Sequence, residues 1–129
     1  MEVRARAREL LPGRDVRPGF DYALTEAVRC KSRGEAGVAD ALETCSSRYL
    51  RRTLEQSGSQ LVVVLGRHAA WAVSAQLGVP ARPRLHPDVS VGGKARAVVF
   101  MPHPNARVAR SFAAVLGKDG LALLRARLA

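Results

Sequence analysis

The sequence predicts an α/β protein built around buried parallel strands. Two continuous apolar runs of strand length, QLVVVLG at 60–66 and ARAVVFM at 95–101, contain the β-branched residues typical of strands buried on both faces. A weaker strand candidate, DYALTEAV at 21–28, precedes them, and a segment with helical features follows each strand. This alternation of strand and helix favours a layered fold with parallel strands.

The first long helix is predicted from a change of period after a polar, glycine-containing loop at 29–37. Apolar residues then recur at spacings of 4, 3 and 4, which places them on one face of a helix. This helix is expected to end near Gln56, before the SGS break. The face consists of Val38, Leu42, Cys45 and Tyr49.

Three further helices are expected. RHAAWAVSAQLG at 67–78 ends on a glycine, a common helix C-terminus. NARVARSFAAVLG at 105–117 is expected to begin with Asn105 as its N-cap. DGLALLRARL at 119–128 completes the chain as an amphipathic helix.

The 129 residues are expected to form one domain. Residues 1–19 form a basic lead-in that contains a short helix, VRARARELL, and residues 80–94 form an exposed loop rich in proline and glycine. Three strands are few for a complete doubly wound sheet. The sheet is therefore either incomplete or completed by another chain.

The charge of the chain favours a polyanionic partner. Lys and Arg total 21 against 11 acidic residues, the formal net charge is +10 and the pI is about 11.2. Such a balance is typical of proteins that bind nucleic acid, although a GC-rich genome would also enrich arginine. The charged N-terminus does not resemble a signal peptide, and no apolar run is long enough to span a bilayer. We expect a cytoplasmic protein, associated with the nucleoid if it binds DNA, with no membrane contact.

Basic side chains gather where the predicted strands end. Ligands of open parallel sheets bind beyond the carboxyl ends of the strands. Two of the three strand-end loops also run into helix N-termini, whose free N–H groups favour anions. We expect a phosphate-binding edge here, although the same side chains would suit a solvated surface. The residues concerned are Arg29, Lys31, Arg33, Arg67, His68, His103 and Arg107.

His103 is the most specific of these residues. Pro102 and Pro104 restrict the backbone on both sides of it, so its ring has a defined direction. An imidazole held at the end of a buried strand can donate a hydrogen bond to a developing anion. A histidine that merely shapes the turn is the alternative. The sequence contains neither a nucleophile elbow nor a glycine-rich phosphate loop of the Lys-Ser/Thr type.

Four segments, in order and spacing, resemble the uracil-DNA glycosylase superfamily, and most closely its iron–sulfur families 4 and 5. The segments are TEAVRCKS, ETCSSRYLRRTL, LVVVLGRHAA and FMPHPNA, and the similarity covers roughly Phe20 to Phe112. The resemblance implies a three-layer α/β/α sandwich with a central parallel sheet. It also implies hydrolysis of the N-glycosidic bond of a deaminated base that has been flipped out of DNA.

The same resemblance implies roles for individual residues. The HP motif of the family places His103 as the catalytic residue that stabilises the departing base. Asn105 to Arg107 correspond to the loop that presses on DNA near the flipped base. In the implied base pocket, Glu26 stands with Asn105, at a position where family 4 has an asparagine that reads uracil. A carboxylate cannot donate to uracil O4, so the recognised base stays open.

Two departures from the family pattern bear on cofactor and catalysis. Cys30 and Cys45 fall where iron–sulfur members have two cluster ligands, but the sequence lacks the N-terminal Cys-x-x-Cys pair, and a 4Fe–4S cluster normally needs four thiolates. We expect no cofactor unless a preceding segment supplies further cysteines. The family's first strand and Gly-Pro-rich loop, which carries the water-positioning residue, also precede the point where this sequence starts. We therefore expect an N-terminally shortened domain.

Three functions are compatible with these observations. The first is a DNA-binding domain related to base-excision repair enzymes that lacks independent catalysis, which we favour. The second is an active DNA glycosylase. The third is an interaction subunit that completes its sheet with a partner chain or in an oligomer.

Overall fold

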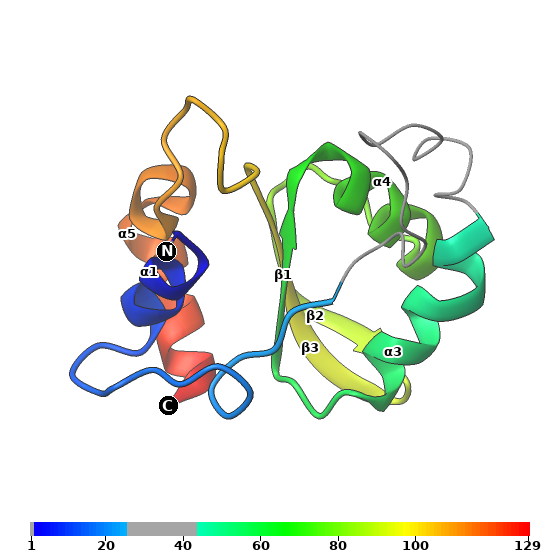
Figure 1. Ribbon diagram of the computed structural model, residues 1–129, viewed down its shortest axis with the longest axis horizontal. Coiled ribbons are helices and arrows are strands. Elements are labelled where there is room, and N and C mark those ends of the chain that lie inside the picture. The colour runs from blue at the N-terminus through cyan, green and yellow to red at the C-terminus, as the bar shows by residue number, and fades with distance from the viewer. Residues whose placement is uncertain (1, 26–43) are drawn as a thin grey trace.

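The computed structural model describes residues 2–25 and 44–129 of the chain. Its sheet separates two groups of helices (Figure 1). In chain order the elements are α1 (Glu2–Leu10), η2 (Ser46–Leu50), α3 (Arg51–Gln56), β1 (Leu61–Leu65), α4 (Gly66–Leu77), β2 (Leu85–Val91), β3 (Lys94–Met101) and α5 (Phe112–Leu128).

The sheet has the strand order β1-β3-β2. The two strands predicted from their apolar runs, β1 and β3, pair in parallel, with Leu61 opposite Ala97 and Leu65 opposite Met101. The helix α4 and the strand β2 lie between them in sequence. The mixed α/β class and the parallel pairing of these two strands are therefore confirmed.

The prediction of an exposed loop at 80–94 is wrong, because most of this segment forms the strand β2 and the turn that follows it. β2 pairs antiparallel with β3, so the sheet is mixed rather than purely parallel. Pro87 is tolerated because β2 lies at the edge of the sheet and its pairing is irregular between His86 and Val89. Gly92 and Gly93 have φ angles of 61° and 78°, which a two-residue hairpin turn requires.

The two faces of the sheet bury separate apolar clusters, which produces three layers. Val98 and Phe100 of β3 point to the side covered by η2, α3 and α4. Ala97, Val99 and Met101 alternate with them and point to the side covered by α1 and α5. Figure 1 shows the two helical layers on opposite sides of the sheet. The three-layer α/β/α arrangement follows directly from this alternation.

The predicted helix over 38–56 is confirmed within the described residues, where it ends at Gln56. Its buried face differs from the prediction, because residues 46–50 form a π-helical turn. Cys45 is buried as expected, but Leu50 and Leu54 are buried in place of Tyr49, which is exposed. A π-turn contains about one residue more than an α-turn, so the inward face moves from position 49 to position 50.

The predicted start of the helix after β3 is also wrong. The helix α5 begins at Phe112, and its N-cap is Ser111 rather than Asn105. The Ser111 hydroxyl accepts a hydrogen bond from the Ala114 N–H at 3.0 Å. The sequence correctly places a break at Gly117, where φ is 77° and the helix is kinked.

The ends of the chain form one layer, in which α1 packs against α5 (Figure 1). The predicted basic helix of the lead-in segment is confirmed as α1. The strand predicted at 21–28 is not formed at residues 21–25, which are turn and irregular backbone apart from an isolated bridge between Pro18 and Tyr22. Residues 26–28 lie outside the described part of the chain.

Candidate functional site

The candidate site lies where the two parallel strands end together. Leu65 at the end of β1 is opposite Met101 at the end of β3. Gly66 continues directly into α4, and β3 runs into the Pro102-His103-Pro104 turn. This edge is the position at which open parallel sheets bind ligands.

Gly66 allows the two strand ends to approach each other. Its φ angle is +85°, which disfavours any side chain, and a Cβ at this position would lie 3.3 Å from both Cβ and Cδ2 of His103. The absence of a side chain at Gly66 thus leaves the space that the imidazole occupies.

Backbone groups on the C-terminal side of His103 fix its ring. The N–H of Asn105 donates to Nδ1 of His103 at 3.1 Å, and the N–H of Ala106 donates to the His103 carbonyl at 2.9 Å. Arg110 reinforces the turn by donating to the Pro104 carbonyl. Because Nδ1 accepts a hydrogen bond, the proton of the neutral ring is assigned to Nε2. His103 is therefore arranged as an Nε2–H donor.

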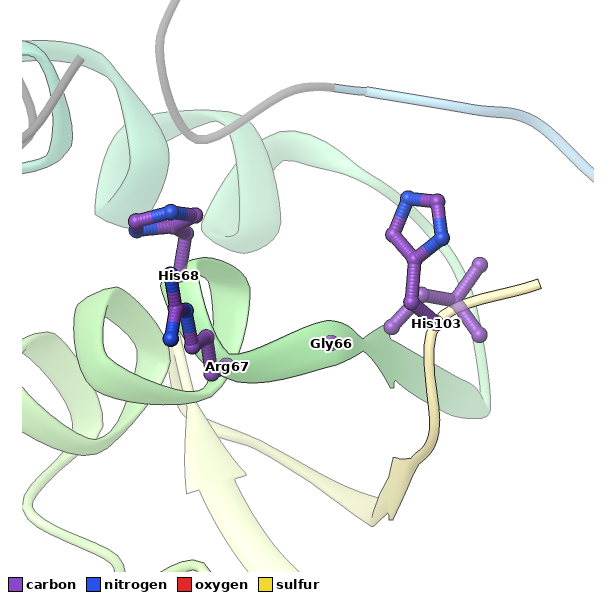
Figure 2. A pocket seen from close by; sticks show the side chains of 5 residues that line it. Gly66, Arg67, His68 and His103 are labelled. Atoms are coloured by element: carbon purple, nitrogen blue, oxygen red, sulfur yellow. The ribbon is translucent and has the colours of Figure 1, made fainter. Parts of the chain in front are cut away.

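A pocket of about 410 Å³ is centred on this edge. Figure 2 shows His103 on one side of Gly66 and the side chains of Arg67 and His68 on the other. Arg67, His68 and His103 are all exposed, so their polar atoms are accessible to a ligand. The described lining residues are Leu65, Gly66, Arg67, His68 and His103.

The pocket suits an anion. It is lined by one guanidinium and two imidazoles, and none of the described residues that line it carries a carboxylate. The first turn of α4, a helix of 12 residues, begins at its wall, and N–H groups in a first turn have no partner within the helix. Side chains and helix terminus therefore favour negative charge at the same place.

The structure brings together three of the residues singled out from the sequence, namely Arg67, His68 and His103. Asn105 lies in the same turn and contacts the imidazole through its backbone N–H, whereas its side chain is exposed. Arg107 is exposed in the loop between β3 and α5 and does not line the pocket. The predicted residues Glu26, Arg29, Cys30, Lys31 and Arg33 lie outside the described residues.

Sequence reasoning missed Gly66 and Leu65 as parts of the site. Leu65 contributes the apolar wall of the pocket, and Gly66 contributes the room for His103. A glycine directly after a buried strand and directly before a helix was the available signal, since such a glycine often marks a close approach of two backbones.

The cluster ligands of the iron–sulfur families fit this chain poorly. Cys45 is buried, with 4% of its surface exposed, and forms no disulfide. Within residues 2–25 and 44–129, no three His, Cys, Asp or Glu side chains are grouped to hold a metal ion. The whole sequence has two cysteines where a four-iron cluster takes four. We therefore derive no step through a cluster, and the lack of a cofactor stays a prediction.

An α/β/α sandwich with a pocket lined by Arg and His side chains at the carboxyl edge of its parallel strands has the architecture of a class of ligand-binding domains. A sequence model of the uracil DNA glycosylase superfamily matches residues 5–123, nearly the whole chain. The chain therefore belongs to the uracil-DNA glycosylase superfamily, which confirms the superfamily resemblance seen in its motifs, whereas the closer likeness to the iron–sulfur families 4 and 5 stays a prediction. No curated protein and no solved structure matches the chain.

Membership in this superfamily supports a DNA glycosylase-like repair function and DNA as the partner. In the described residues, no helix has both the length and the apolar character needed to cross a membrane.

Proposed function

We propose that this chain binds DNA at the pocket between Gly66 and His103 and does not hydrolyse the glycosidic bond by itself. The observation that carries the proposal is the composition of the pocket wall, whose described residues offer donors and positive charge and no carboxylate. A DNA strand presents phosphate and base oxygens that accept hydrogen bonds from such groups.

His103 is the directional contact in this proposal. Its Nε2–H donates to an oxygen of the bound strand, while the Asn105 N–H holds the opposite side of the ring. Arg67 and the first N–H groups of α4 neutralise the adjacent phosphate. Because a backbone N–H holds the His103 ring and the first N–H groups of α4 belong to the helix itself, these donors are in place before DNA arrives.

Among the described lining residues, hydrogen-bond donors and positive charge predominate, which supports binding. Hydrolysis of the glycosidic bond requires a positioned water and a group that accepts its proton. In the described part of the pocket wall, imidazoles alone could serve that purpose, and the His103 Nδ1 lone pair is already engaged by Asn105.

An active DNA glycosylase is the second candidate, and the tautomer of His103 favours it. An Nε2–H aimed at the pocket would stabilise negative charge on a departing base in the way an oxyanion donor does. Binding and catalysis then differ only in whether a water is activated at the same pocket.

The binding arm of the test measures anisotropy of labelled single- and double-stranded oligonucleotides titrated with the purified chain. We expect His103→Ala to weaken binding by roughly tenfold, as the loss of a charge-assisted hydrogen bond does. His103→Gln keeps a side-chain N–H donor and should recover part of the affinity. Gln56→Ala, which removes an exposed polar side chain at the end of α3, is the control. Equal affinity of His103→Ala and the wild type would contradict the proposed contact.

The catalytic arm incubates the chain with single- and double-stranded DNA that contains uracil or hypoxanthine, followed by alkaline cleavage at abasic sites. We expect no abasic product above that of His103→Ala. Product formed by the wild type and lost in His103→Ala would establish the glycosylase and overturn binding without catalysis.

A further inference from the structure

The outward face of α4 carries a large aromatic ring next to the pocket. Trp71 has 51% of its surface exposed, although tryptophan is normally well buried. It lies three residues after His68 and four after Arg67, so the three side chains are neighbours on one helix face. The rise along the helix axis from His68 to Trp71 is about 5 Å. The ring therefore stands within one helical turn of the pocket wall.

On the exposed face of α4, the side chains between Trp71 and the pocket are Arg67 and His68, and the exposed side chain on the other side of Trp71 is the small Ala75. The exposed residues of α4 are Arg67, His68, Trp71 and Ala75, and Trp71 is the single large apolar side chain among them. A protein-docking surface would need several large apolar side chains together at its centre. One exposed aromatic ring next to cationic side chains instead matches the pattern of surfaces on which nucleic-acid bases stack.

We propose that Trp71 is a stacking platform for an unpaired base of the DNA strand held at the pocket. This inference rests on the proposed DNA binding and adds a preference for single-stranded or locally opened DNA. Bases inside a duplex already stack on both neighbours, so a protein ring reaches a base face only where the strand is unpaired or the base is extruded. Arg67 and His68 contact the phosphate, and the base of the same or the next nucleotide lies on the indole.

The chain provides its own probe, because Trp71 is its single tryptophan. Titration of the wild type with unlabelled oligothymidine should quench the intrinsic fluorescence in parallel with the anisotropy increase of a labelled strand. Trp71→Ala should weaken single-strand binding by roughly 5- to 150-fold, the range expected for loss of one stacked base. Trp71→Phe should retain part of the single-strand affinity. The affinity for duplex DNA should change little in either variant.

An oligonucleotide of abasic nucleotides separates stacking from phosphate contact, since it has the same backbone and no bases. The wild type should bind it more weakly than oligothymidine, and Trp71→Ala should cause no further loss. Phe20→Ala is the matched control, because it removes another exposed aromatic ring, one that lies against the Arg17 guanidinium at 4.5 Å. Circular dichroism of each variant verifies the fold.

The outcomes separate this inference from the proposed function. If Trp71→Ala binds oligothymidine as tightly as the wild type while His103→Ala is weakened, stacking is refuted and DNA binding stands. If the wild type binds no DNA, both are refuted. A concentration-dependent dimer in sedimentation that Trp71→Ala abolishes would assign the ring to a second copy of the chain and overturn the stacking role.

Discussion

Gly66 controls the geometry of the site through a single missing methyl group. Any other residue at this position would have to adopt a positive φ. Its Cβ would also crowd the side chain of His103, at 3.3 Å. Gly78, at the other end of the same helix, has a positive φ of 69° and nothing within 4 Å of a Cβ among the described residues. The two glycines therefore share a backbone requirement and differ in their neighbours.

Gly66→Ala and Gly78→Ala are each expected to lower the free energy of unfolding by about 1–2 kcal/mol, because alanine is strained at positive φ. Only Gly66→Ala should also weaken DNA binding, by several-fold, since it displaces His103. Urea denaturation and anisotropy measure the two effects. A Gly66→Ala variant with wild-type DNA affinity would show that the imidazole position does not matter.

Arg96 is a charged residue in the interior, with 1% of its surface exposed. Its guanidinium donates to the carbonyls of Leu54, Glu55 and Ser57 at 2.6, 3.2 and 2.8 Å, and also to the Val91 carbonyl at 3.2 Å. These contacts cap the C-terminal end of α3, where the helix carries partial negative charge. The charge is thus stabilised by carbonyl dipoles.

Arg96→Met should lower the free energy of unfolding by about 3–5 kcal/mol, because four carbonyls lose their donor and two of these hydrogen bonds, to Leu54 and Val91, are buried. Arg52→Met, on the exposed side of the same helix, should change it by less than about 0.5 kcal/mol. Chemical denaturation of both variants tests the difference. Similar stability of the two would mean that water replaces the guanidinium.

At the scale of elements, α1 sets where α5 begins. The Glu9 carboxylate accepts from the N–H groups of Phe112 and Ala113 at 2.7 and 3.0 Å, and Arg6 donates to the same carboxylate. The Glu9 carbonyl accepts from Arg125 near the end of α5. One residue of α1 therefore contacts both the first turn and the last turn of α5.

Glu9→Ala is expected to lower the free energy of unfolding by about 1–2 kcal/mol, through loss of a capping group and of its interaction with the helix dipole. Glu9→Gln keeps one acceptor oxygen and should lose less. Asp119→Ala removes an exposed carboxylate from α5 itself and is the control. Hydrogen exchange of the Phe112 and Ala113 amides should accelerate in Glu9→Ala alone, and unchanged exchange would argue against the cap.

For the whole molecule, a net charge of +10 makes DNA affinity depend on salt. The logarithm of the binding constant should fall linearly with the logarithm of salt concentration, by about 0.7 per phosphate contacted on a single strand. Arg67→Ala should reduce this slope by the contribution of about one phosphate contact. Arg8→Ala, on α1 in the opposite layer, should leave the slope unchanged. Anisotropy titrations at several salt concentrations provide the slopes. Equal slopes for the two variants would indicate diffuse attraction without a defined phosphate site.

The expected partner chain or oligomer also belongs to this scale and stays a prediction. In the sheet formed by the described residues, β1 and β2 occupy the two edges. Sedimentation of the purified chain tests it, and a strictly monomeric chain would count against an interaction subunit.

The parallel strands, the helix α4 and the place of His103 at a strand end could all be predicted from the sequence. These features depend on local signals, because a continuous apolar run, a glycine after it and a proline-bounded turn act over a few neighbouring residues. The family motifs lie in the same segments, and the match to the superfamily agrees with them.

Other features could not be predicted, because they need partners that are distant in sequence. β2 has too few apolar residues for its sequence to predict a buried strand. It forms because its backbone pairs with β3. The first turn of α5 is capped locally by Ser111 and also by Glu9, which lies more than a hundred residues away in sequence. The pocket beside His103 arises where two strand ends that are distant in sequence meet. The donor nitrogen of His103 is set locally, by the Asn105 N–H, and Trp71 lies near the pocket because α4 begins at one of those strand ends. Local propensity determines which elements form, whereas long-range packing and hydrogen bonding determine what those elements present to a ligand.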